Sequence, residues 1–412
     1  MDFKEKFYQF LKWLERYTQT DMIYLAQGGF WWILGKILTF FISLVTLIAF
    51  ARFSPKEVYG GYQYILSVAG VLVIFSLPGI DIALIRSVAQ GKEKIIFPCL
   101  KEKIKFGGLG SLIAFFVSLW YFLHQNSELG FSFLIMALFL PFLNSFLIYF
   151  YFWHGKKKFD IQNKYFIWHN FLAGIVLILV IFLTKNLILI VLTYFLAFTL
   201  AEGIFLKLTL KKVSDGDDAK ETISFGKHLT LMQSASLFSE QIDKIILWQF
   251  LGPLAVAVWS FAQKPVLRCQ EIIPISPLAL PKLSQVKVKE RKNQIFKKFL
   301  KLFLFSIPLT ILYILACPIF FRIFFPTYLE AVPYSQGFSL ILIFVPFLLL
   351  QTTFLAEMRK KELYILNFVS PILKTILFLI LIPLFEIWGI VASFLISQIF
   401  SGLLSVYFFR RI

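Results

Sequence analysis

Four cationic side chains lie near the middle of long apolar segments, where burying a charge costs free energy. They are Lys36, Lys264, Arg268 and Lys374. A charged side chain inside a bilayer usually faces the interior of a helix bundle or a water-filled cavity. Arginine offers phosphate a planar, two-pronged donor, and lysine offers a mobile point charge. The chemistry that these residues suggest is therefore the binding of an anion, such as a diphosphate or an acidic sugar.

Three ionisable residues of one segment share a helix face. Lys264, Arg268 and Glu271 are spaced at i, i+4 and i+7. At 1.5 Å per residue, Lys264 lies roughly 18 Å and Arg268 roughly 24 Å from the outer end of this helix. We interpret the face, together with Lys36 and Lys374, as the cationic wall of a substrate cavity. The structural alternative is an ion pair between Arg268 and Glu271 and a snorkelling lysine, which mid-depth makes difficult for Lys264.

Carboxylates in the apolar segments are candidates for ion coupling or for pairing with these cations. Glu240 and Lys244 stand at i, i+4 in the order that favours an ion pair, so Asp243 is the freer carboxylate. Asp243 either pairs with a cavity cation, takes up a proton or sodium ion during a transport cycle, or holds its helix against a neighbour. Glu202 is a lone carboxylate for which coupling and packing both stay open. Glu271 completes this group.

Asp81 and Arg86 end the second apolar segment on its cytoplasmic side. They are either a structural anchor and ion pair or a cytoplasmic gate. The three cysteines, Cys99, Cys269 and Cys317, stand alone, without the Cys or His spacing of a metal site. The four histidines are scattered near segment ends, where we interpret them as interfacial. We therefore expect no metal site and no catalytic residues.

The elements that position these residues are transmembrane helices. Hydrophobic residues make up 59% of the 412 positions and charged residues only 16%, against about 45–50% and about 25% in soluble domains. This composition excludes a soluble enzyme, a nucleic-acid-binding protein and a disordered protein, despite the net charge of +18. The apolar runs are continuous rather than alternating, which favours helices over strands. We expect twelve spans, at 24–50, 58–85, 105–123, 129–153, 165–184, 187–207, 225–250, 253–280, 299–321, 333–356, 363–384 and 387–409.

The distribution of basic residues orients these spans. With the N-terminus in the cytoplasm, 32 of the 41 Lys and Arg residues fall in cytoplasmic segments and four in outer loops. Because cytoplasmic loops of membrane proteins are enriched in Lys and Arg, this asymmetry predicts that both termini are cytoplasmic. Residues 1–22 carry apolar residues at helical spacing between charged ones. They predict an amphipathic helix on the membrane surface rather than a cleavable signal peptide.

The two halves of the chain resemble each other. The turn after the first span contains Pro55 followed by Tyr62, and the turn after the seventh contains Pro253 followed by Trp259. Six helices in each half predict two bundles related by a pseudo-two-fold axis along the membrane normal, with substrate bound between them and alternating access. The predicted parts are an interfacial helix at 1–22, a six-helix bundle at 23–210, a cytoplasmic linker at 211–223 and a second bundle at 224–412.

Three stretches carry motifs whose order and spacing are informative. They are Gly60-Gly61-Tyr62 with Pro78-Gly79-Ile80-Asp81, then Gln241-Ile242-Asp243-Lys244 with Leu251-Gly252-Pro253, and finally Pro281-Lys282-Leu283-Ser284. With these motifs the chain resembles the polysaccharide flippases (Wzx type) of the multidrug/oligosaccharidyl-lipid/polysaccharide exporter superfamily. Ala257 and Trp259 stand where that family usually has Gly and Tyr, a mild departure.

The resemblance implies an all-helical, V-shaped exporter fold and a non-enzymatic function. It implies a flippase that moves polyprenyl-diphosphate-linked oligosaccharide, such as O-antigen units, across the cytoplasmic membrane of a bacterium or archaeon. No cofactor is implied beyond a coupling ion, H⁺ or Na⁺. The implied partners are the lipid-linked substrate, membrane lipids, a polysaccharide polymerase and chain-length machinery, and no nucleic acid.

Three other functions compete with this one. A drug or cation antiporter of the superfamily should favour buried carboxylates at mid-depth, where lysines dominate in this chain. A lipid II flippase would typically carry two further spans. A membrane polysaccharide polymerase needs an acid/base or metal site, usually on a sizeable outer loop. The longest outer loop, near 322–332, is short and offers only Arg322 and Glu330.

Overall fold

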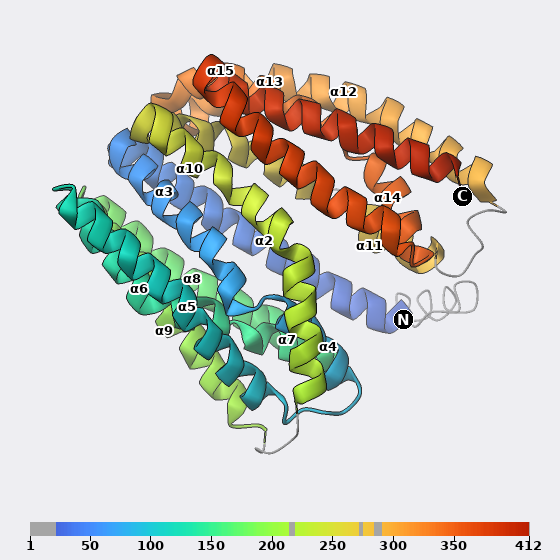
Figure 1. The fold of residues 1–412 in the computed structure, drawn as a ribbon, viewed down its shortest axis with the longest axis horizontal. Helices are drawn as coiled ribbons and strands as arrows, with labels where there is room; N and C mark the ends of the chain where they lie inside the picture. Colours follow the sequence, from blue (N-terminus) through green and yellow to red (C-terminus); the bar gives the residue numbers. More distant parts are fainter. Residues whose placement is uncertain (1–21, 214–218, 272–274, 284–290, 412) are drawn as a thin grey trace, which may run out of the picture. The chain divides into compact units, whose positions relative to one another are not determined.

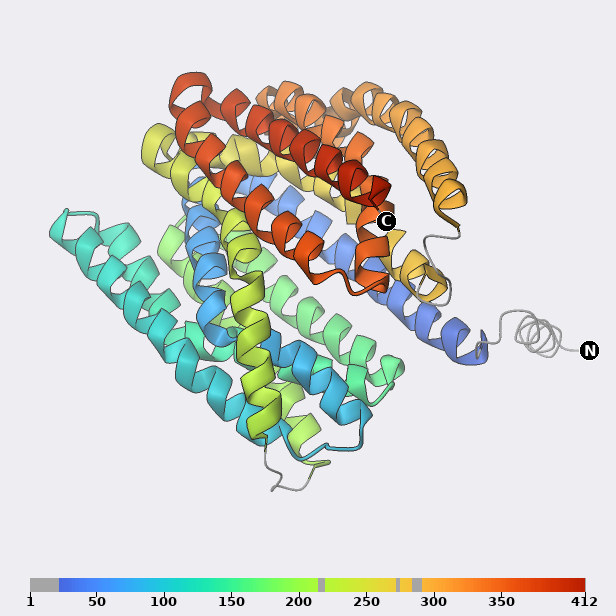
Figure 2. The same cartoon turned by 45° about the vertical axis from the view of Figure 1, so that its right-hand side comes forward.

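The computed structural model describes residues 22–213, 219–271, 275–283 and 291–411, and every regular element within these ranges is a helix (Figures 1 and 2). The predicted surface helix at 1–22 lies outside these ranges except for its last residue. In chain order the elements are α2 (Met22–Phe53), α3 (Lys56–Leu72), η1 (Val73–Ser76), α4 (Gly79–Ala89), α5 (Ile96–Leu123), α6 (Ser127–Phe146), α7 (Ile148–Gly155), α8 (Phe159–Leu183), α9 (Leu187–Leu210), α10 (Lys220–Glu271), α11 (Ile275–Leu283), α12 (Lys292–Phe324), η3 (Pro326–Ala331), α13 (Val332–Phe338), η4 (Ser339–Phe344), α14 (Phe347–Ala356) and α15 (Lys360–Arg410).

Nine of the described helices are long and apolar enough to cross a membrane, or ten if one bent pair counts as a span. The bent pair joins Pro326–Phe344 to Phe347–Ala356 at an angle of 43°. Large apolar side chains such as Phe116, Leu179 and Leu312 are exposed on these helices. Apolar surface of this extent is stable only where lipid covers it. The chain is therefore an all-helical, multi-pass membrane protein, as the composition predicts.

Two long helices are each interrupted once by a residue with a non-helical backbone. In α10 this residue is Gly252, with φ 75° and ψ −169°, and Pro253 follows it. Such a φ is readily adopted by glycine, and proline cannot continue the hydrogen-bond ladder of a helix. In α15 the interruption is at Glu386, with φ 54° and ψ −131°. Both interruptions lie in the short gaps that the sequence predicts between consecutive apolar segments.

The second predicted span, 58–85, is not one helix. α3 ends at Leu72 and is followed by the 3₁₀ helix η1, after which Leu77 adopts a left-handed backbone with φ 52°. Pro78 then precedes α4, which begins at Gly79. Because proline lacks a backbone N–H, it favours the start of a new helix over continuation of the old one. The predicted gate residue Asp81 consequently lies in the first turn of a separate helix.

Contacts between Cα atoms divide the chain into two compact units. Unit 1 comprises the described residues up to Ala49 together with Leu72–Thr230. Unit 2 comprises Phe50–Val71 and the residues from Leu231 onward. This division differs from the bundle boundaries drawn on the sequence, since residues 50–71 precede the predicted linker and yet group with the C-terminal part.

Close packing explains why residues 50–71 belong to unit 2. A Cβ at Gly60 would overlap the backbone carbonyl of Pro253. The rings of Tyr64 and Trp248 stack with centroids 4.4 Å apart. These contacts hold the first half of α3 against α10 through surfaces that only a glycine and flat rings can form.

Unit 1 has a dense core beside four long helices. α5, α6, α8 and α9 lie side by side (Figures 1 and 2). The core contains Ile80, Ile148 and Phe152, all fully buried. The Trp153 indole N–H donates to Thr209 Oγ1 at 2.9 Å, so this buried tryptophan keeps its hydrogen bond. The short helices α4 and α7 are thereby fixed against the long ones.

Candidate functional site

Unit 2 holds Lys264 among buried aromatic side chains. The Lys264 Nζ donates to the Tyr59 hydroxyl at 2.7 Å and lies 5.2 Å from the centroid of that ring. Tyr59 is fully buried and packs on Phe261, with centroids 4.8 Å apart. Phe261 in turn stacks on Tyr328 at 3.7 Å. The ammonium, on a half-buried side chain, is therefore held by a neutral phenol, and no carboxylate of the described chain pairs with it.

The far side of this aromatic group carries an unusual hydroxyl. Tyr328 is fully buried, and its hydroxyl has no hydrogen-bond partner among the described residues. Above its ring, at 5.3 Å from the centroid, lies the Nζ of Lys56. Lys56 forms a 2.5 Å ion pair with Glu330, and both side chains are partly exposed. An unpartnered buried hydroxyl costs about 1–3 kcal/mol, which marks this as a place where packing overrides hydrogen bonding.

Asp243 is fully buried and is held mainly by uncharged donors. The Trp259 indole N–H donates to Oδ2 at 2.8 Å and the Gln263 amide donates to the same oxygen at 3.4 Å. The backbone N–H of Lys244 donates to Oδ1 at 2.8 Å. Three N–H groups therefore satisfy the hydrogen-bond acceptors of one buried carboxyl group.

The ion pair predicted between Glu240 and Lys244 is absent. The Lys244 Nζ instead lies 3.7 Å from Oδ1 of Asp243, its neighbour in sequence. Glu240 is exposed, and within the described residues it forms no ion pair. Burial explains the difference, because a buried lysine gains more from the buried carboxylate than from an exposed one.

Lys374 of α15 lies near the same carboxylates. Its Nζ is 4.7 Å from the centroid of the Phe394 ring and 5.9 Å from that of Phe378. The charges of Asp243 and Glu240 are within electrostatic reach. In the described part of the chain, Lys374 makes no hydrogen bond and no ion pair. Ring faces attract a cation but use none of its three N–H donors.

The remaining predicted cavity cations have other surroundings. Arg268 forms a 2.8 Å ion pair with Glu271, and both side chains are more than 40% exposed. The structure therefore contains the ion pair between Arg268 and Glu271 that the sequence offers as the alternative to a cationic cavity wall. Lys36 is exposed on α2 and belongs to unit 1, whereas Lys264, Arg268 and Lys374 belong to unit 2.

Unit 1 pairs its buried charges differently from the prediction. Asp81 accepts a 2.5 Å hydrogen bond from Lys103, whose side chain is 1% exposed. Arg86 makes no pair with Asp81 and instead lies over the Phe225 ring, 5.7 Å from its centroid. The predicted pair is wrong because both residues lie in α4, where a spacing of five residues places their side chains about 140° apart around the helix. Asp81 faces Lys103 of α5 instead.

The sequence suggests that Glu202 is a lone carboxylate, but the structure places His169 and Tyr149 beside it. His169 Nε2 lies 4.0 Å from Glu202 Oε1. On its other side, the His169 ring shares a 2.9 Å hydrogen bond with the hydroxyl of Tyr149. His169 is 3% exposed, so our interpretation of this histidine as interfacial is wrong.

Some contacts of the site residues can be predicted from the sequence, and others cannot. Asp243 and Trp259 stand nine residues before and seven residues after Gly252. Since the two arms of a helical hairpin run antiparallel, similar distances from the turn bring side chains level, and this contact could be anticipated. Lys264 and Tyr59 are 205 residues apart and carry no such signal. Lys103 lies in a basic run between the predicted spans 58–85 and 105–123, so its burial is not predicted.

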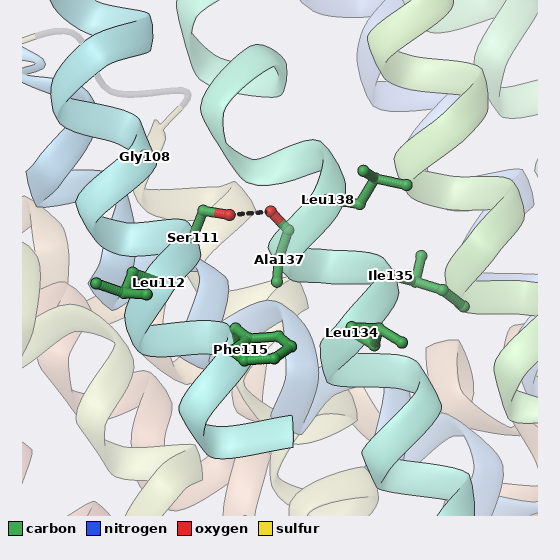
Figure 3. A pocket seen from close by; sticks show the side chains of 8 residues that line it. All are labelled: Gly108, Ser111, Leu112, Phe115, Leu134, Ile135, Ala137 and Leu138. Atoms are coloured by element: carbon green, nitrogen blue, oxygen red, sulfur yellow. Dashed lines mark hydrogen bonds between the residues drawn. The ribbon is translucent and has the colours of Figure 1, made fainter. Parts of the chain in front are cut away.

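A groove of about 540 Å³ lies between α5 and α6 of unit 1 (Figure 3). Ser111 Oγ donates to the Ala137 carbonyl across it. The large side chains that line it are apolar: Leu112, Phe115, Leu134, Ile135 and Leu138. No charged side chain lines the groove, so it is no part of the cationic site. Within the described residues, no group of three or more His, Cys, Asp or Glu side chains could hold a metal ion.

The sequence has relatives across most of its length. Residues 25–281, more than half of the chain, match the sequence model of a family described as polysaccharide biosynthesis protein. An uncharacterized membrane protein of Methanocaldococcus jannaschii is 23% identical over 94% of this chain and 84% of its own length.

Solved structures show the same fold. An inward-facing multidrug resistance MATE family transporter of the MOP superfamily matches 90% of this chain and 94% of its own with a TM-score of 0.68 at 12% identity. The lipid II flippase MurJ in an inward closed conformation matches 93% and 87%, with a TM-score of 0.66 at 16% identity. A MOP superfamily transporter from Pyrococcus furiosus matches 94% of this chain and 95% of its own, with a TM-score of 0.63 at 13% identity. At these identities the likeness concerns the fold.

Proposed function

The chain belongs to the polysaccharide biosynthesis protein family, and on this premise we propose that it is a flippase for polyprenyl-diphosphate-linked oligosaccharide. It carries units of O-antigen or a related surface polysaccharide from the cytoplasmic to the outer leaflet by alternating access. The observation that carries the proposal is that the ammonium groups of Lys264 and Lys374 contact aromatic side chains rather than carboxylates. A diphosphate would supply the anionic partner that each lacks.

The bonds of Lys264 suit a ligand that must bind and leave again. Replacing the Tyr59 hydroxyl by a phosphate oxygen exchanges a hydrogen bond worth about 1 kcal/mol, whereas opening a buried ion pair costs about 3–5 kcal/mol. Asp243, whose charge reaches Lys374, already accepts hydrogen bonds from Trp259, Gln263 and the Lys244 backbone. Its charge moderates the positive field, so that a phosphate is attracted and still released.

We propose twelve spans with both termini in the cytoplasm of a bacterial or archaeal cell. The support comes from the ten candidate spans, two of which turn back once, at Gly252 and Glu386. The bias of Lys and Arg toward one side of these spans supports the orientation. Lys36 and Arg268 stay candidates for lining the path, and Asp81 and Arg86 for the cytoplasmic gate.

We propose that the protein works without a cofactor and that a proton or sodium gradient drives the cycle. Candidate coupling carboxylates are Asp243, Glu240, Glu271 and Glu202. A polysaccharide polymerase and chain-length machinery would act on the flipped product. Transport into lipid vesicles, measured with and without each gradient, tests the coupling ion.

Binding of a prenyl diphosphate by the purified protein tests the substrate site. We expect geranylgeranyl diphosphate to raise the thermal unfolding temperature, and geranylgeraniol, which lacks the diphosphate, to raise it much less. The variant that carries both Lys264→Ala and Lys374→Ala should lose the difference between the two ligands. Lys185→Ala, which removes an exposed cation of an outer loop, is the matched control and should keep it.

Two results would contradict the proposal. One is an equal response of the wild-type protein to the diphosphate and the alcohol. The other is normal surface glycan in cells whose only flippase carries both Lys264→Ala and Lys374→Ala. Stabilisation by a cationic drug in place of the diphosphate would favour the antiporter alternative.

A further inference from the structure

Unit 1 contains a buried polar group for which flipping a lipid has no evident need. It consists of Tyr149 on α7, His169 on α8 and Glu202 on α9. Glu202 is 5% exposed, and one of its oxygens, Oε2, has no hydrogen-bond partner in the described chain. The other oxygen, Oε1, lies 4.0 Å from His169 Nε2. A buried carboxyl group with so few partners destabilises the folded protein unless it is neutral or paired with an opposite charge.

The hydrogen bond between Tyr149 and His169 orients the imidazole. When the phenol donates to Nδ1, the proton of the neutral ring is on Nε2, the atom that faces Glu202. The pair is then neutral in two ways: a carboxylic acid beside a neutral imidazole, or a carboxylate beside an imidazolium. Both states hold the same number of protons. Loss of one proton leaves an uncompensated carboxylate in the interior of the unit.

The neighbouring charged groups do not replace this proton. Lys103 of α5 is within electrostatic reach of Glu202, but its ammonium is bonded to Asp81 of α4 at 2.5 Å. The other titratable groups around Glu202 are phenols, which are neutral at physiological pH: Tyr149 and Tyr151 of α7 and Tyr194 of α9.

Asp243 of unit 2 is a buried carboxyl group whose hydrogen-bonding capacity is well satisfied. Its two oxygens receive N–H groups from Trp259, Gln263 and the backbone of Lys244. Glu202 receives none of these. Thr199, one turn earlier on the same helix, also has a buried hydroxyl without a partner. The surroundings of Glu202 therefore favour its protonated form.

We propose that Glu202, together with His169 and Tyr149, is a proton-binding site within unit 1, and that its proton is the coupling ion of the transport cycle. The second half of this inference rests on the proposed function, and the first half does not. While the site is buried the proton stays on the carboxyl–imidazole pair. It leaves to water, with Glu202 becoming a carboxylate, only in a conformation that admits water to the site.

Infrared difference spectroscopy on the full-length protein in lipid vesicles tests the site without any substrate. Between acidic and alkaline buffer, the wild-type protein should show the band of a buried carboxylic acid that is lost as its carboxylate forms. Glu202→Gln should remove this band. Glu128→Gln, which alters an exposed carboxylate at the start of α6, is the matched control and should leave it unchanged.

Tyr149→Phe keeps the ring and removes only the hydroxyl that orients the imidazole. We expect it to shift the midpoint of the Glu202 band by about one pH unit, the size of effect that a single hydrogen bond exerts on such an equilibrium. It also keeps the test valid if Glu202→Gln fails to fold, because the wild-type band and its shift are measured in folded protein. An unmoved midpoint would overturn the role of His169 and Tyr149.

Two further outcomes would overturn the site itself. One is a Glu202 band that is absent, or that persists unchanged over the whole pH range in which the protein stays folded. The other is a band that responds to sodium at constant pH, which would make the site one for a metal cation.

The coupling role is tested separately by uptake of lipid-linked oligosaccharide into vesicles. Glu202→Gln should abolish the stimulation of this uptake by a proton gradient, whereas the control Glu128→Gln should keep it. Retained stimulation would overturn the coupling role alone. Failure of the wild-type protein to transport this substrate would overturn the proposed function and the coupling role with it, and leave the proton-binding site standing on the infrared result.

Discussion

The two units neutralise buried charge in opposite ways. In unit 1, Lys103 and Asp81 form a 2.5 Å pair with side-chain exposures of 1% and 8%. In unit 2, Lys264 bonds to a tyrosine hydroxyl and Lys374 lies against phenylalanine rings. Asp243 of the same unit accepts hydrogen bonds mainly from uncharged donors. Unit 2 also contains the buried pair of Lys244 and Asp243, 3.7 Å apart. The contrast therefore concerns particular lysines: the charge of Lys103 is neutralised inside the protein, whereas the charges of Lys264 and Lys374 stay available to a ligand.

This difference separates a structural charge from a binding charge. A closed buried ion pair is costly to open, because each partner would then be left unpaired in an apolar environment. A lysine held by a phenol or a ring face can take an anionic ligand at the cost of a weak contact. The residues suited to a substrate are therefore those whose charge has no counter-charge bonded to it.

Removal of Lys103 should have the largest effect on stability. Lys103→Ala leaves Asp81 buried without its partner and should lower the free energy of unfolding by about 3–5 kcal/mol. Unfolding in a mixed-detergent titration measures this change. The double variant Lys103→Met with Asp81→Leu should recover most of the loss, because it removes both charges. If the double variant is as unstable as the single one, the pair is not what holds α4 on α5.

Removal of one donor from Asp243 should have a smaller effect. Trp259→Phe deletes the 2.8 Å hydrogen bond to Oδ2 and should cost about 1.5–3 kcal/mol, the range for a hydrogen bond to a charged group. The loss is smaller than for Lys103→Ala because two N–H donors remain on the carboxylate. The same titration measures it. A loss larger than that of Lys103→Ala would reverse the contrast between the units.

Lys264 should matter to ligand binding far more than to stability. Lys264→Met should change the free energy of unfolding by less than about 1 kcal/mol, since the lysine is half-buried and breaks no ion pair. The affinity of the Lys264→Met variant for geranylgeranyl diphosphate should fall about tenfold, the loss expected for one charge-assisted hydrogen bond. Thermal unfolding at graded ligand concentrations gives both quantities. A marked destabilisation with unchanged affinity would make Lys264 a structural residue.

The exposed pair Arg268–Glu271 should have the smallest effect. Its side chains are 41% and 49% exposed, and exposed ion pairs typically contribute less than about 1 kcal/mol. Glu271→Gln should therefore leave the unfolding titration almost unchanged. If Glu271→Gln instead strengthens binding of the prenyl diphosphate, the pair masks a cation of the site, and Arg268 joins the binding charges.

Much of the fold could be predicted because its causes are local. The apolar runs predict the helices, and the interruptions at Gly252 and Glu386 lie where those runs end. The break before α4 was missed because hydropathy continues through 73–78, and only the backbone of Leu77 and Pro78 interrupts the helix.

The candidate site could be predicted in its residue types but not in its pairings. Lys264, Lys374 and Asp243 stand out because charge within an apolar run is rare. Their partners, Tyr59 and Phe394 among them, are ordinary aromatic residues in a chain that is 18% aromatic. Nothing in the sequence distinguishes these rings from the many others.

Hydropathy and charge are properties of each residue, so the amino-acid sequence is enough to identify a helical membrane protein with ionisable residues in its apolar segments. Which of these charges are neutralised inside the protein depends on its tertiary structure. Asp81 forms an ion pair with Lys103, Glu202 lies 4.0 Å from His169, and Lys264 donates a hydrogen bond to the Tyr59 hydroxyl. Whether a buried charge has a counter-charge depends on distances of a few ångströms across helices, and these are set by packing rather than by position along the chain.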